Sequence, residues 1–415
     1  MGGVKQFQQY PGLEDDIRDL RYALSGLFPN ERKVVEILGK RSQAHRESIA
    51  EGYKLLFAES LPKRLKASMS CKAERCLMLW MMDPSERDAV LLYEALSQGG
   101  PKKDRAVIGM LCTRSSAQLY LIKQAYYSVF CQTLENHLDG SGFVFPEPQN
   151  KRKWAFWRSA EPKVEDPPKR QLAITKLLLA LARGSRPENT TVDRHIALTD
   201  AHQLNKVCSG KLGNEETLIR IFSTRSPYQL TATMNFYEQH YGHDFEKALS
   251  KKDAGEFLQA LRAVVQCLRR PSEFYAEDII TALSKGNGPV DEDTLVQIIT
   301  TRADVDMHMI RIEFMKECKR ALEQVISERA MGVIGQFLVT AIRQRDMVFN
   351  SRPTSEGSTN SYYTNPLSTG SRQSSDRSQP DTFHSGSQGS SGTNSSHNSF
   401  TSKSNQHAIV SASGS

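Results

Sequence analysis

Apolar residues recur every three or four positions along most of the first 350 residues, which is the spacing of one face of an α-helix. Clear examples are 171–183 (QLAITKLLLALAR) and 256–270 (EFLQALRAVVQCLRR), and Gly and Pro stand at the joins between such segments. The strict alternation of apolar and polar residues that is typical of strands is almost absent. The pattern therefore predicts an all-α protein.

Four of the helical segments resemble one another, which predicts an internal repeat. Each has an aliphatic run, then an arginine, then an aromatic residue twelve positions later. The arginines are Arg41, Arg114, Arg225 and Arg302, and the aromatic residues are Tyr53, Tyr126, Tyr237 and Phe314. Repeated chemistry at four equivalent positions is unusual. We therefore interpret the arginines as structural, in an ion pair or a helix cap, and the rings as core residues.

The composition of the chain changes near residue 350. From there to residue 415 the sequence is rich in Ser, Gly and Asn and poor in aliphatic residues, as in GSQGSSGTNSSHNSF. Such a segment cannot bury enough apolar surface to offset the entropy lost on ordering. We expect a disordered tail over 348–415.

Charge and motifs narrow the class of function. The net charge of +7 favours anionic surfaces only mildly and does not identify a nucleic-acid-binding protein. No window of eighteen apolar residues predicts a membrane span, and the first twelve residues lack the apolar core of a signal peptide. Seven cysteines without CxxC spacing indicate a reduced, cytoplasmic protein. Phosphate-binding loops and HExxH motifs are absent, and the histidines show no metal-ligand spacing, so we expect no enzyme.

Several motifs together resemble the annexin family, and the plant annexins in particular. They are the four repeats, the KRS or TRS that follows an aliphatic run, DPSERDA at Asp83–Ala89 and QCLRRP at Gln266–Pro271. The resemblance covers about Tyr10 to Arg345. It implies a slightly curved disc of four five-helix repeats. The predicted ranges are 10–88, 89–185, 186–271 and 272–347, followed by the tail.

The resemblance also implies calcium-dependent attachment to anionic phospholipid membranes, by a monomer or weak oligomer on the cytoplasmic side. In annexins a K-G-x-G-T loop and an acidic residue about 27 positions after the repeat arginine hold the ion. The corresponding positions here are Ser68, Ser141, Lys252 and Arg329. Because Ca²⁺ needs carboxylate and carbonyl oxygens, we expect calcium binding to be weak or lost.

The fourth repeat keeps the loop best. Gly286 and Gly288 offer backbone carbonyls there, and Glu328 lies one residue from the expected acidic position. These three residues are the remaining candidates for a weak calcium site.

Two apolar residues in the first repeat could contact lipid without calcium. Leu27 and Phe28 stand in SGLFPN, where the family has its calcium loop. The alternative is that both side chains fold onto the neighbouring helix, and the sequence leaves the two possibilities open.

The second repeat contains an insertion, about 139–170, whose centre is KRKWAFWR. Trp and Phe favour the membrane interface, and Lys and Arg favour anionic headgroups. The predicted membrane-contact residues are Lys151, Arg152, Lys153, Trp154, Phe156, Trp157 and Arg158. A loop folded back over a groove between repeats is an equal alternative. Nucleic-acid binding is not expected from one short segment.

Two further features come from the resemblance alone. The tripeptide IRI, at 219–221 and 310–312, has been linked with actin in plant annexins, so an actin-binding scaffold is the alternative function. Cys112 and Cys267 stand where plant annexins carry a cysteine pair proposed to be redox-active, although buried free thiols explain them as well. The histidine linked with peroxidase activity in the family is replaced by Lys40.

Overall fold

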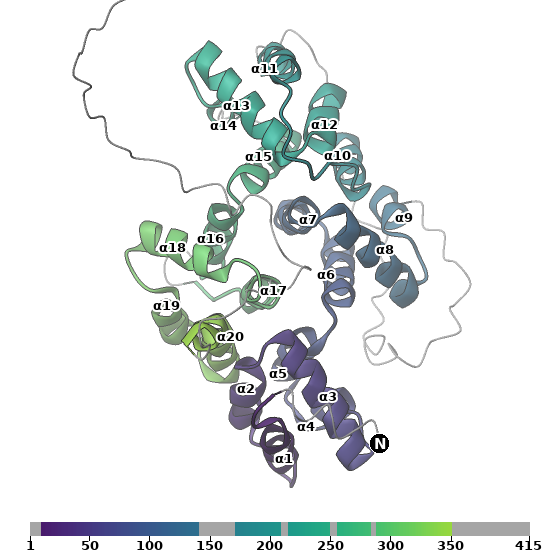
Figure 1. Ribbon diagram of the computed structural model, residues 1–415, viewed down its shortest axis with the longest axis vertical. Coiled ribbons are helices and arrows are strands. Elements are labelled where there is room, and N and C mark those ends of the chain that lie inside the picture. Colours follow the sequence, from purple (N-terminus) through teal and green to yellow (C-terminus); the bar gives the residue numbers. More distant parts are fainter. Residues whose placement is uncertain (1–9, 141–170, 209–214, 250–254, 284–287, 351–415) are drawn as a thin grey trace, which may run out of the picture. The chain divides into compact units, whose positions relative to one another are not determined.

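The computed structural model describes residues 10–140, 171–208, 215–249, 255–283 and 288–350. Every regular element in these ranges is an α-helix, which confirms the all-α prediction (Figure 1). No described helix combines the length and apolarity needed to cross a bilayer.

Over the described ranges the helices form four successive groups of five, and the second group begins at Pro84, a few residues before the predicted boundary. The first group is α1 (Leu13–Ala23), α2 (Glu31–Gly39), α3 (Gln43–Phe57), α4 (Leu61–Ser68) and α5 (Cys71–Met81). The second is α6 (Pro84–Gln98), α7 (Pro101–Thr113), α8 (Ser116–Phe130), α9 (Leu134–Asp139) and α10 (Leu172–Ala182). The third is α11 (Arg194–Cys208), α12 (Glu215–Thr224), α13 (Pro227–Tyr241), α14 (Phe245–Leu249) and α15 (Glu256–Arg269). The fourth is α16 (Pro271–Ala282), α17 (Glu292–Arg302), α18 (Met307–Cys318), α19 (Leu322–Arg329) and α20 (Gly332–Asn350).

The serine after the repeat arginine begins the third helix of a repeat. Ser42, Ser115 and Ser226 are the N-caps of α3, α8 and α13, and each hydroxyl accepts a hydrogen bond from the backbone N–H three residues on. A serine at this position satisfies one of the N–H groups that the first turn leaves without a partner. The fourth repeat has Ala303 instead, and α18 begins only at Met307.

The four repeat arginines form ion pairs, as predicted. Arg41, Arg114 and Arg225 pair with Asp16, Asp88 and Asp200 on the first helix of their own repeats, and each Nε lies 2.6 Å from a carboxylate oxygen. The second of these pairs is almost fully buried, with side-chain exposures of 1% and 0%. These ion pairs join the second helix of each repeat to the first.

In the fourth repeat the arginine has a different ion-pair partner. Arg302 pairs with Asp306, four residues on, with its Nε 2.8 Å from Oδ1. Two acidic residues on the first helix of that repeat, Glu277 and Asp278, pair with Arg105 from the second repeat. The repeat arginine therefore forms an ion pair within its own repeat in all four repeats, and only in the fourth repeat does the partner come from outside the first helix.

The four repeat aromatics lie in the core, which confirms the second part of that interpretation. Tyr53, Tyr126 and Tyr237 are fully buried, and Phe314 is 1% exposed. A buried ring of this size removes a large apolar area from water and is among the strongest contributors to a helical core.

The most extensive contacts between repeats include those of the first with the fourth and of the second with the third. Helix α2 packs against α20, and α7 packs against α15. Gly39 lies where α2 meets α20, and a Cβ there would come within 2.9 Å of Thr340 Cγ2. The close approach of these two helices therefore depends on the absence of a side chain at position 39.

Candidate calcium and membrane-contact loops

The loop between α1 and α2 projects two apolar side chains. Gly26 adopts φ +83°, which turns the chain, and Leu27 and Phe28 are each 92% exposed. The base of the loop is closed by the Asn30 N–H, which donates to the Ala23 carbonyl at 2.8 Å. Of the two possibilities that the sequence left open, these side chains therefore point outward and do not pack on a neighbouring helix.

Arg64, on α4, stabilises the same loop by hydrogen bonds. The Arg64 guanidinium donates through both Nε and Nη2 to the Leu24 carbonyl, and the Nε distance is 3.2 Å. Ser68, the expected acidic position, is the last residue of α4. Nearby, the Glu31 carboxylate accepts from the backbone N–H and hydroxyl of Ser70. The Arg64 guanidinium and the hydrogen bonds between Glu31 and Ser70 therefore connect the α1–α2 loop region to α4 and to the residues that follow it.

The loop of the second repeat is reduced to two glycines. Gly99 and Gly100 both adopt positive φ, and Pro101 begins α7 directly after them. Ser141 and the predicted membrane-contact residues, Lys151 to Arg158, lie outside the described residues. The candidate loops of the third repeat, 209–214 and 250–254, lie outside them as well.

In the fourth repeat a guanidinium reaches the glycine loop. Arg329 Nη2 lies 3.1 Å from the Gly288 carbonyl oxygen and donates to it. Glu328, the candidate carboxylate, accepts from Arg320 and from Gln324 Nε2. The hydrogen bond from Arg320 holds the pKa of Glu328 below its usual value. Gly286 lies outside the described residues.

Among the described residues, two of the four repeats have a guanidinium at a backbone carbonyl of the loop region. Calcium requires six to eight oxygen ligands, including carboxylates, whereas Arg64 and Arg329 place positive charge on the loop carbonyls. Over the described ranges, no group of three or more Asp, Glu, His or Cys side chains could hold a metal ion. Arg64 stands in a basic run, KRLK at 63–66, but its contact with Leu24 could not be predicted from that run.

The structure brings the two candidate redox cysteines together, because α7 and α15 pack side by side. Burial raises the pKa of the Cys267 thiol well above its usual value, and contact with Cys112 raises it further. Burial alone would raise the pKa of Cys112 too. A hydrogen bond from Cys267 and the nearby Arg186 guanidinium outweigh burial and lower it. Both residues are free thiols, with Cys112 partly exposed.

The IRI tripeptides are mostly core. Ile219, Ile221 and Ile310 are buried, while Ile312 is 47% exposed. Arg220 Nη2 donates to Gln203 Oε1 at 2.9 Å. Three of the four isoleucines therefore cannot contact a partner directly.

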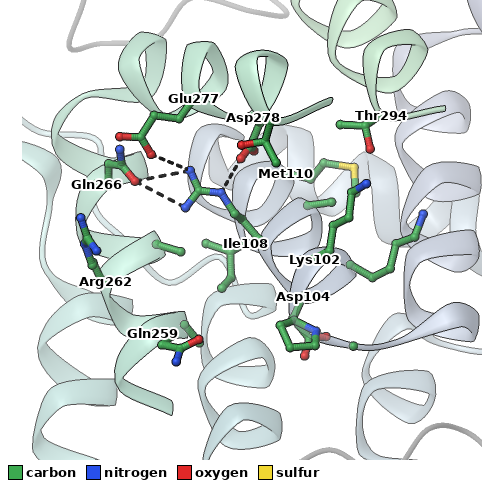
Figure 2. A pocket seen from close by; sticks show the side chains of 18 of the residues that line it. Lys102, Asp104, Ile108, Met110, Gln259, Arg262, Gln266, Glu277, Asp278 and Thr294 are labelled. Carbon is green, nitrogen blue, oxygen red and sulfur yellow. Dashed lines mark hydrogen bonds and ion pairs between the residues drawn. The ribbon is translucent and has the colours of Figure 1, made fainter. Parts of the chain in front are cut away.

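A cavity of about 800 Å³, lined by charged and apolar side chains, lies among α7, α15, α16 and α17. Figure 2 shows Gln266, Glu277 and Asp278 converging on one guanidinium, which is that of Arg105. Burial raises the pKa of Asp278, and Arg105 opposes that change. This network joins the second repeat to the third and fourth, and Lys102 and Arg262 line the same cavity.

Comparisons with known proteins agree with these helices. A family model described as Annexin matches residues 15–80, 199–264 and 274–341, and so leaves the second five-helix group unmatched. Annexin D2 of Arabidopsis thaliana is 30% identical over 83% of this chain and 100% of its own length. Annexin Gh1 of Gossypium hirsutum is 31% identical over 78% of this chain and 92% of its own. The solved structure of annexin III superposes with a TM-score of 0.68 at 27% identity, over 80% of this chain and 95% of its own.

Proposed function

Because the chain belongs to the annexin family, we propose that it attaches to anionic phospholipid membranes with little or no dependence on calcium. The family is known for calcium-dependent phospholipid binding. In this protein, apolar and basic side chains in place of bound calcium make the contact with the membrane. The protein acts on the cytoplasmic side of the membrane, in a binding role without catalysis.

The hydrogen bond from Arg329 to the Gly288 carbonyl is the main observation in favour of weak or lost calcium binding. This loop is the best preserved of the four, so it is the place where calcium binding would persist longest. A guanidinium on one of its carbonyls competes with an incoming cation by charge and by occupying the oxygen. Arg64 has the same relation to the Leu24 carbonyl in the first repeat.

Leu27 and Phe28 supply a contact that needs no ion. Transfer of such a side chain from water to a fully apolar environment is worth about 1.5–3 kcal/mol. Both are already exposed, so insertion into a lipid surface requires no unfolding of the core. The segment Lys151–Arg158 is the second proposed anchor, and each of its cations would add about 1 kcal/mol near an anionic surface.

Flotation with phosphatidylserine-containing liposomes in EGTA tests the membrane contact. We expect the full chain to float, and Leu27→Ala with Phe28→Ala to reduce the floating fraction several-fold. The control is Leu55→Ala on α3, which removes a 63% exposed leucine outside the loops and should have no effect. A triple change of Trp154, Phe156 and Trp157 to Ala tests the second anchor. If neither set of variants alters flotation, both anchors are wrong.

Isothermal titration with CaCl₂ tests the calcium part separately. We expect no micromolar site in the wild type, and we expect Arg329→Glu to strengthen calcium binding because a carboxylate replaces the competing cation. Arg329→Met removes the charge without adding an oxygen ligand and is the matched control. A micromolar site in the wild type that disappears in a Gly288 variant would contradict the proposal.

The alternative function is a calcium-insensitive scaffold for actin. Arg220, Arg311 and the exposed Ile312 could take part directly, whereas the other isoleucines of the two IRI motifs are buried. Cosedimentation with filamentous actin separates the two functions. Binding to actin with no flotation on liposomes would favour the scaffold.

A further inference from the structure

Two histidines from different helices of the third repeat meet at the protein surface. Helices α11 and α13 pack against each other and bring the rings of His202 and His240 together. The ring centroids lie 5.8 Å apart and the ring planes are inclined at 78°. Both residues are exposed, and neither belongs to the loops of the proposed function.

The δ nitrogens of both rings are held by neighbouring groups. His240 Nδ1 lies 3.0 Å from the Phe236 carbonyl oxygen. Because a carbonyl only accepts, Nδ1 carries the proton in this contact, and the neutral ring presents its lone pair at Nε2. His202 Nδ1 lies 2.6 Å from the Tyr241 hydroxyl, which can accept from it in the same way. Metal-binding histidines are typically oriented by such a partner at the second nitrogen.

The separation of the rings suits a shared metal ion. Zinc binds histidine nitrogen at about 2.0–2.1 Å, so a tetrahedral angle at the metal puts two ring centres on the order of 5–6 Å apart. The observed 5.8 Å falls in this range. Imidazole nitrogen favours zinc, copper and nickel, whereas calcium favours oxygen, so this chemistry differs from that of the family loops.

We propose that His202 and His240 form a two-histidine site for a divalent transition-metal ion such as Zn²⁺, with water completing the coordination. Over the described ranges no third His, Cys, Asp or Glu joins such a group, so the site takes the metal by two protein ligands. A bound ion links α11 to α13, the first and third helices of this repeat.

Isothermal titration of the full chain with ZnCl₂, and separately with NiCl₂, tests the site. We expect one binding event, weakened at least tenfold by His202→Asn and by His240→Asn. Tyr241→Phe removes only the partner of His202 Nδ1 and should weaken binding less. The control is His195→Asn, an exposed histidine on the same helix, which should leave the affinity unchanged.

Two results would overturn the proposal. One is the absence of any binding event with millimolar zinc or nickel. The other is binding that survives the double variant His202→Asn with His240→Asn but disappears with Cys112→Ser, which would assign the metal to the thiols. Because the histidines are exposed, the variants should keep the wild-type circular dichroism and melting temperature without metal.

Discussion

Removal of the Asp88 carboxylate tests most directly whether the buried ion pair between the first two helices of a repeat stabilises the fold. Asp88 receives two hydrogen bonds from Arg114, at 2.6 Å from Nε and 3.2 Å from Nη2. Neither side chain has meaningful contact with water. Asp88→Ala would leave the Arg114 guanidinium inside the protein without its carboxylate, and Asp88→Asn would keep the shape of the acceptor and remove only the charge.

The expected cost follows from burial. Breaking a buried ion pair by removing one partner costs about 3–5 kcal/mol, because the remaining charge loses its compensation. For the roughly 330 residues of the four repeats, an unfolding entropy of about 2.1 cal/mol/K per residue gives about 0.7 kcal/mol/K. The melting temperature should therefore fall by about 4–7 °C in Asp88→Ala, and by less in Asp88→Asn.

Differential scanning calorimetry and urea titration measure the effect, with an exposed ion pair as the control. Arg18 and Glu14 form such a pair on α1, with side-chain exposures of 66% and 53%. Glu14→Ala should cost only about 0.3–0.5 kcal/mol, less than 1 °C here. If Asp88→Ala lowers the melting temperature no more than Glu14→Ala does, the buried pair contributes nothing and the reasoning fails.

Three further predictions concern single sites. Burial lowers the pKa of His45. The neutral ring therefore contributes its full stabilisation above about pH 6.5, and this contribution is lost as the pH falls through the folded-state pKa. Melting temperatures measured from pH 7.5 to 5 should fall less in His45→Gln than in the wild type. Iodoacetamide should alkylate Cys112 before Cys267, and a peptide map showing the reverse order would contradict the assigned pKa directions. Gly39→Ala should lower the urea midpoint by the equivalent of about 1–3 kcal/mol, because the new methyl group meets Thr340; an unchanged midpoint would show that the two helices separate at little cost.

The sequence by itself determined the helices, their grouping and the residues of the core. Helical spacing of apolar residues and capping by serine are local properties, so α3, α8 and α13 could be predicted to start after their serines. The buried repeat aromatics followed from the same periodicity. The repeat arginines followed from their recurrence, because a motif repeated four times indicates a structural role.

Only the tertiary structure decided which groups these residues meet. Arg302 occupies a repeated position, yet its partner is Asp306, because α16 has Tyr275 where the first three repeats have their aspartate, and the Arg302 guanidinium lies over that ring. Arg64 faces the Leu24 carbonyl from a helix 40 residues away. His202 and His240 show no ligand spacing along the chain and meet only where α11 packs on α13. Pairing and charge neutralisation depend on distances in space, which local propensity and periodicity do not fix.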